Sequence, residues 1–127
     1  MTKPGAASFG TGMPNYPAVY AIAAALEYLH TVGVAAIEAH ADPLVRDCLA
    51  ELKKLPVELL TPDEPGAIAG ILAFRHPRAA QIHEHLHAQN IHVMHHAGRL
   101  RIAVHGYNTS TDVDRFLSAF REALHDV

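Results

Sequence analysis

Apolar residues at helical spacing predict two helices in the first part of the chain. The first is expected over residues 17–30, because Pro17 suits a first helical turn and apolar side chains then recur every three or four residues. Gly33 is a typical residue for its end. The second is expected over residues 33–54; Pro43 lies inside it and predicts a kink or a break near Ala41.

Short apolar runs bounded by turn residues predict four strands, with one helix in their middle. The strands are expected over residues 57–60, 68–74, 91–94 and 100–104. The turn-forming residues 61–66 favour an antiparallel hairpin of the first two strands. The helix is expected over residues 78–89, because Pro77 precedes it and Asn90 can form its left-handed C-terminal cap.

The last helix has the clearest N-terminal signal. Its cap can be Thr109, Ser110 or Thr111. The acidic side chains of Asp112 and Asp114 suit the positive end of the helix dipole. The order helix, helix, strand, strand, helix, strand, strand, helix predicts an α+β fold of two layers, in which helices cover a small, mostly antiparallel sheet.

The composition bounds the domain count and the partners. The chain has 127 residues, a length typical of one domain, and we expect residues 1–13 to form a flexible arm and residues 14–127 to form a single domain. A net charge of -3 with scattered Lys and Arg favours neither nucleic acid nor an anionic membrane as a partner. The longest apolar run, residues 18–26, is too short to cross a bilayer. The single cysteine, Cys48, predicts a reducing, cytoplasmic setting.

Arg101 stands near the start of the fourth expected strand and is followed by a polar loop. An arginine beside a cleft can bind a carboxylate through two parallel hydrogen bonds, although most arginines form only surface ion pairs. Residues 107–109 (YNT) and 112–114 (DVD) follow it. This segment resembles the signature R-x-S-x-x-x-Y-N-T-x-x-D-(V/I)-D of class V aminotransferases and cysteine desulfurases. The resemblance implies that Arg101 binds the α-carboxylate of an amino-acid substrate; Ala103 replaces the serine of the signature.

The N-terminal segment resembles the same family. Residues 9–18 (FGTGMPNYPA) are similar to the pattern F-E-x-G-T-P-N-x-P-A, and residues 23–29 continue the likeness. In the family, the threonine of this pattern contacts the phosphate of the pyridoxal phosphate (PLP) held by the neighbouring subunit, but Met13 occupies that position here. The resemblance leaves Thr11 and Gly12 as candidates for this contact.

The resemblance implies further substrate contacts at Asn15 and His96. It covers about residues 9–125 and corresponds to the last third of a full family member. The large domain, with the lysine that forms a Schiff base with PLP, has no counterpart in these residues. The lysines present lack the small, polar sequence context of a PLP lysine; they are Lys3, Lys53 and Lys54.

The resemblance therefore predicts a domain rather than a complete enzyme. We expect the isolated chain to hold no cofactor and to catalyse no PLP reaction, whereas the parent enzyme would use PLP and an amino-acid substrate. The expected function is that of the C-terminal domain that binds the substrate carboxylate and supports a dimer. Its partner would be a second copy in a homodimer, or a missing PLP-binding large domain.

Two other functions stay open at this point. One is a self-associating interaction module, because a lobe without its large domain exposes apolar surface. The other is a metal-binding domain, in which His83 and His87 share a helix face and His92 supplies a third ligand. Solvated histidines without a metal are the favoured interpretation of this segment. Cys48 is interpreted as a packing residue rather than as the nucleophile of a desulfurase.

Overall fold

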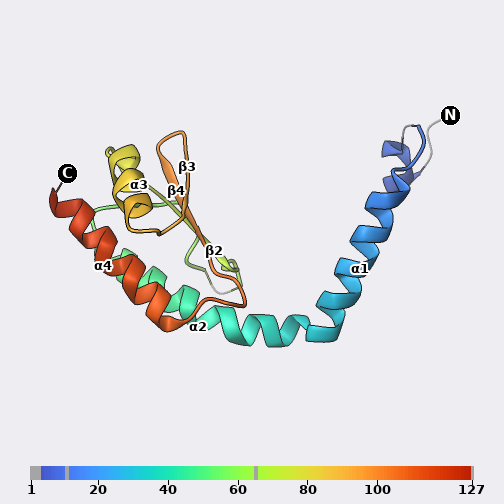
Figure 1. Ribbon diagram of the computed structural model, residues 1–127, viewed down its shortest axis with the longest axis horizontal. Helices are drawn as coiled ribbons and strands as arrows, with labels where there is room; N and C mark the ends of the chain where they lie inside the picture. The colour runs from blue at the N-terminus through green and yellow to red at the C-terminus, as the bar shows by residue number, and fades with distance from the viewer. Residues whose placement is uncertain (1–3, 11, 65, 127) are drawn as a thin grey trace. The chain divides into compact units, whose positions relative to one another are not determined.

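The computed structural model describes residues 4–10, 12–64 and 66–126, which belong to two compact units (Figure 1). Unit 1, Met1–Val34, contains a short 3-10 helix, η1 (Gly5–Phe9), and helix α1 (Tyr16–Val32). Unit 2, Ala35–Val127, contains the sheet and the other helices. The boundary between the two units falls after Val34. The expected division into a flexible arm and a single domain stays a prediction.

Helix α1 has the expected signals at both ends. At its start, the side-chain Oδ1 of Asn15 accepts a hydrogen bond from the backbone N–H of Ala18 at 3.2 Å, and Pro17 lies in the first turn. At its end, Gly33 has a φ of 88°, a left-handed conformation that glycine adopts without a Cβ clash. The expected helix is thereby confirmed. The short helix η1 lies within the segment for which no regular element was predicted.

Unit 2 is built on a four-stranded sheet with the order β1-β2-β4-β3, in which all neighbours are antiparallel. The strands are β1 (Glu58–Leu59), β2 (Ile71–Arg75), β3 (Met94–His96) and β4 (Arg99–Ala103). The antiparallel pairing of β1 with β2 confirms the expected hairpin. Strands β3 and β4 are joined by Ala97 and Gly98, whose φ values of 49° and 70° fit the tight type of turn that needs two left-handed residues.

Helices α2 (Val34–Leu52), α3 (Ala79–Ala88) and α4 (Ser110–Asp126) supply the second layer of unit 2 (Figure 1). Side chains alternate along each strand, so Phe74 of β2 and Leu100 of β4 point toward the helices and are fully buried. The ring of Phe120 on α4 meets Phe74 edge-on, with ring centroids 5.2 Å apart. This core between one sheet face and three helices confirms the two-layer α+β fold.

Two strands differ from their expected positions. The expected strand over residues 91–94 is wrong in position, because β3 begins at Met94. The backbone N–H of Ile91 donates to the carbonyl of Leu86 at 2.9 Å, so the chain leaving α3 is still bound to that helix and joins the sheet only later. Similarly, β2 begins at Ile71 rather than at Ile68, whose side chain is apolar because it packs against the core.

Helix α2 continues through Pro43, so of the kink or break expected near Ala41 the break does not occur. A proline inside a helix leaves the carbonyl of the residue four positions earlier without its backbone partner. That residue, Ala39, is exposed, so water can satisfy its carbonyl. Within the residues that the structure describes, no single helix is long and apolar enough to cross a membrane; α1 and α2 meet that test only when joined, on length and composition alone.

Candidate functional site

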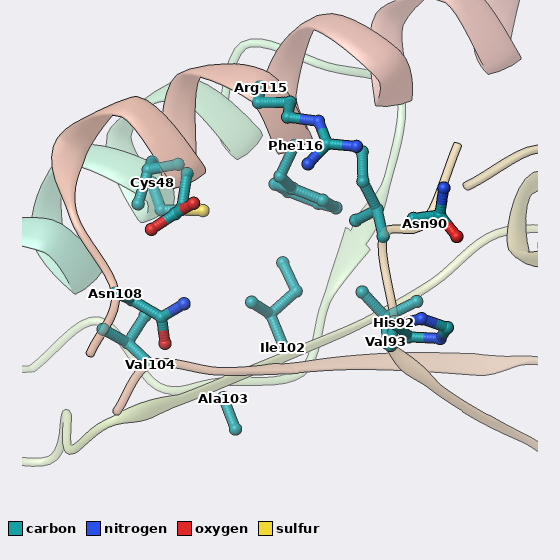
Figure 2. A pocket seen from close by; sticks show the side chains of 13 residues that line it. Cys48, Asn90, His92, Val93, Ile102, Ala103, Val104, Asn108, Arg115 and Phe116 are labelled. Carbon is teal, nitrogen blue, oxygen red and sulfur yellow. The ribbon is translucent and has the colours of Figure 1, made fainter. Parts of the chain in front are cut away.

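The sheet face opposite the helices carries Arg101. Along β4, Leu100 and Ile102 point toward the helices, so the side chains between them lie on the other face. Figure 2 shows the alternation at neighbouring positions, where Ile102 points toward α4 and Ala103 points away from it. We call this second face the open face, because its side chains are exposed or half-buried. It consists of Ile71, Ala73, Arg75, Met94, His96, Arg99, Arg101 and Ala103.

Arg101 lies in the middle of the open face. Its Cα partners are Ala73 on β2 and Met94 on β3. Because Ala73 carries only a methyl group, the guanidinium has room on that side. Among the described residues, Arg101 forms no ion pair and no side-chain hydrogen bond. Its planar fork of N–H donors is thus available to an anion such as a carboxylate.

His96 lies on the open face beside Arg101, whereas the other predicted site residues belong to unit 1. His96 is exposed and stands directly opposite Arg99 in the sheet. Asn15 caps α1, so its side-chain oxygen is already engaged and its NH₂ group is the part left for a ligand. Gly12 is exposed and has a φ of 83°. Thr11 lies outside the described residues.

The loop that follows β4 is held by its own polar side chains. The Oδ1 of Asn108 accepts a hydrogen bond from the backbone N–H of His105 at 2.8 Å. The carboxylate of Asp112 accepts hydrogen bonds from the backbone N–H and the hydroxyl of Thr109 at 2.8 and 3.0 Å. The backbone hydrogen bond is the main reason why the pKa of Asp112 lies below its usual 3.8. These residues therefore fix the loop and the start of α4. The sequence placed Thr109 and Asp112, which have the spacing of a capping box, at the start of this helix, but it did not predict that Asn108 holds the loop.

A cavity of about 170 Å³ lies on the helix side of β4 (Figure 2). Ile102 of β4 and Phe116 of α4 contribute apolar walls, and His92, Asn108 and Arg115 contribute polar groups. Its lining does not include Arg101 or any other residue of the open face except Ala103. The cavity is therefore separate from the candidate carboxylate site.

Cys48 also lines this cavity, where it acts as a packing residue. Its side chain is 1% exposed, and burial raises the pKa of its thiol to about 12. Since the thiolate is the nucleophilic form, we expect Cys48 to react slowly near neutral pH. The interpretation of this residue as part of the core is confirmed.

The histidines of α3 and of the following segment form a chain of neighbouring rings. The ring centroids of His83 and His87 are 6.1 Å apart, those of His87 and His92 are 5.0 Å apart, and those of His83 and His95 are 5.5 Å apart. In the part of the chain that the structure describes, no three His, Cys, Asp or Glu side chains are arranged to hold one metal ion. The metal-binding alternative with His83, His87 and His92 therefore gains no support.

Comparison with known proteins covers most of the chain. Residues 2–116 match the protein family described as "Aminotransferase class-V". The "Uncharacterized aminotransferase YcbU" of Bacillus subtilis (strain 168) is 30% identical over 105 residues, which are 83% of this chain and 28% of that protein.

Solved structures share the fold. A "NIFS-LIKE PROTEIN" aligns with a TM-score of 0.75 at 23% identity, over 92% of this chain and 36% of its own. The apo cysteine desulfurase of Thermococcus onnurineus NA1 aligns with a TM-score of 0.78 at 24% identity, over 94% of this chain and 34% of its own. At these identities the likeness shows the fold alone. The chain spans between 28% and 36% of the length of these three proteins.

Proposed function

The chain belongs to the class V aminotransferase family, and on this premise we propose that it is the C-terminal lobe that binds the α-carboxylate of an amino-acid substrate through Arg101. The observation that carries the proposal is the exposed guanidinium of Arg101 at the middle of the open face. It has no ion-pair partner among the described residues, and Ala73 leaves space beside it.

The role of Arg101 in this proposal is to bind and orient. Its guanidinium donates two parallel N–H bonds to the two oxygens of the carboxylate, which fixes the direction of the substrate as well as its position. The backbone of Arg101 is held on both sides by the pairing of β4 with β2 and with β3. The hydrogen bonds of Asn108 and Asp112 hold the loop at the end of the same strand. The lobe thus offers a rigid attachment point for the substrate.

The described residues do not fit a PLP site of their own. Bound in a parent enzyme, PLP supplies the electron sink for chemistry at the substrate's Cα, and it is held there by a lysine. Here Lys53 is paired with Asp63 and Lys54 with Glu51, all at the surface, and Lys3 lies outside the described residues. We therefore propose that a large domain outside this chain holds the cofactor, and that the chain alone is not catalytic.

The exposed apolar surface of helix α1 supports the proposal that the chain has a partner. None of its residues is buried, and it exposes large apolar side chains. They are Tyr16, Val19, Tyr20, Ile22, Leu26, Tyr28, Leu29 and Val32. Apolar surface gathered in this way usually marks an interaction site. We propose that the PLP-binding large domain covers α1, with a homodimer of this chain as the alternative; the cytoplasmic location stays a prediction.

Carboxylate binding by the full chain tests the role of Arg101. The side-chain Nε–H signals of the arginines are followed by NMR while propionate is added at constant ionic strength. We expect a saturable shift at Arg101, its loss in Arg101→Ala, and weaker binding in Arg101→Lys, which keeps the charge but not the fork. Arg46→Ala, which removes another exposed arginine, is the matched control and should behave like the wild type. Binding that survives in Arg101→Ala would refute the proposal.

Two further measurements test the remaining parts. Absorbance during a PLP titration should show no aldimine band that responds to added amino acid; such a band would mean that a lysine of this chain forms a Schiff base. Sedimentation over a range of concentrations separates the two partners of α1. A concentration-independent monomer favours the large domain, whereas a dimer that Leu26→Glu dissociates favours the homodimer.

A further inference from the structure

We propose that the open face selects amino-acid substrates whose side chain ends in a second anionic group, and that Arg99 binds that group. The inference rests on the proposed function, because it takes Arg101 as the residue that holds the α-carboxylate. It adds the class of side chain that the substrate carries, which the family membership leaves open.

A row of charged side chains crosses the open face next to Arg101. The Cα partners of Arg99 are Arg75 on β2 and His96 on β3, so the two arginines stand directly opposite each other and an imidazole lies on the other side of Arg99. Like charges in this arrangement destabilise a sheet. Glu58 of β1 relieves Arg75, which it contacts at 3.4 Å. Glu58 contacts Arg75 but not Arg99, so Arg99 faces the charge of Arg75 without a carboxylate partner of its own.

Arg99 itself has no compensating acid. Within the described ranges it forms neither an ion pair nor a side-chain hydrogen bond, and its side chain is exposed. The nearest carboxylate along its row is Glu58, two strands away and already bound to Arg75. An anion placed on Arg99 would replace a repulsive arrangement by an attractive one, which is the physical reason to expect one there.

The spacing of the two arginines suits one ligand with two carboxylates. Arg99 and Arg101 are two residues apart on one strand and lie on the same face, so their Cα atoms are about 7 Å apart. Each carries a flexible stem with a planar fork at its end, and the two forks can therefore bind opposite ends of one short molecule. The other end of the face differs, because Ala103 and its partner Ile71 offer only apolar surface beyond Arg101.

Open space borders the charged row as well. A shallow depression of about 510 Å³ lies at the turn between β3 and β4. Glu58, Arg75 and the turn residues Ala97 and Gly98 are among its walls. The walls of this depression do not include Arg99, so it borders the row at Arg75 and at the turn. A side chain that extends from Arg101 toward Arg99 approaches positive charge, whereas one that extends toward Ala103 meets the apolar side chains of Ala103 and Ile71.

The test compares succinate, which has two carboxylates, with propionate, which has one, on the full chain. Arginine Nε–H signals are followed by NMR at constant ionic strength. We expect succinate to bind about threefold to fivefold more tightly than propionate, the size of one exposed ion pair, and to shift the signals of both Arg99 and Arg101. In Arg99→Ala the two probes should bind alike, and Arg99→Lys should keep part of the difference. Arg46→Ala is the matched control and should keep all of it.

The outcomes separate this inference from the proposed function. If propionate binds at Arg101 and succinate gains nothing, or if the gain persists in Arg99→Ala, the second-anion site is refuted and the carboxylate role of Arg101 stands. If neither probe shifts Arg101, both fail. Sulfate carries the same charge as succinate in one compact group, so an equal gain with sulfate would show attraction by charge alone and overturn the inference that the two arginines bind two separate carboxylates.

Discussion

Burial should make Cys48 almost inert in the folded chain. The pKa of its thiol rises from the ordinary 9.0 to about 12, a difference of about three units. At any pH below both values, the thiolate fraction is therefore about a thousandfold lower in the folded state than in the unfolded state. Because thiolate attacks disulfide reagents and the side chain is 1% exposed, we expect modification of the native chain to be slower by about a thousandfold or more.

A coloured disulfide reagent measures this difference directly, with rates recorded near pH 8 in buffer and in concentrated urea. The matched control is Ala50→Cys in a Cys48→Ala background, which places a thiol on the exposed side of the same helix, α2. This control should react rapidly in both conditions. A native rate for Cys48 within about tenfold of the unfolded rate would refute the reasoning, because it would mean that the thiol is neither desolvated nor shielded.

The same pKa shift predicts how alkali destabilises the fold. The unfolded thiol ionises first, at about 9.0, while the folded thiol stays protonated up to about 12. Its contribution to the free energy of unfolding is therefore complete below pH 9 and is lost as the pH rises toward 12, at about 1.4 kcal/mol per pH unit in that window. Urea unfolding of the wild type and of Cys48→Ala over this range should show the extra slope only in the wild type. Equal slopes would contradict the assignment.

Three further predictions concern stability. Ala97 holds a left-handed φ of 49°, so Ala97→Asn should raise the free energy of unfolding by about 0.5–1 kcal/mol in urea melts, and a decrease would argue against the turn. Phe120 is fully buried, and Phe120→Ala should cost about 3–5 kcal/mol in the same assay, whereas the exposed control Phe9→Ala should change little. The pKa of Asp112 is lowered by hydrogen bonds from Thr109, so its contribution to the free energy of unfolding is present above pH 3.8 and is lost as the pH falls below that value. Asp112→Asn should therefore flatten the acid side of the curve of unfolding free energy against pH. An unchanged curve would count against this capping contact.

The elements that the sequence predicts best are those with both a periodic pattern and an end signal. Helix α4 has an apolar stripe together with Thr109 and Asp112 at its start, and its position agrees with the prediction. Strand β3 is the counter-example. Ile91 and Val93 are apolar because they pack against the core, and apolar character alone cannot distinguish packing from pairing. Where a strand begins and ends depends on the strand that pairs with it, and the apolar pattern of one segment carries no information on that partner.

Some residues of the candidate site could likewise be predicted from the sequence, and others could not. Arg101 could be found from its signature, because a motif fixes residue type and spacing together. The row formed by Arg75, Arg99 and His96 could not, since Arg75 is far from the other two in the chain and meets Arg99 only through the register of β2 with β4. Asn108 and Asp112 could be seen in the signature, but their hydrogen bonds within the loop become visible only in three dimensions.

The two edge strands of the sheet limit the ways in which copies of this chain can associate. Strand β1 has two residues and strand β3 has three, so each offers few unpaired backbone groups to a strand of another molecule. Short edges of this kind are a common protection against the growth of continuous β-structure. In the absence of its partner, the chain should therefore aggregate through the apolar side chains of α1. Mild detergent rather than denaturant should be enough to reverse this aggregation.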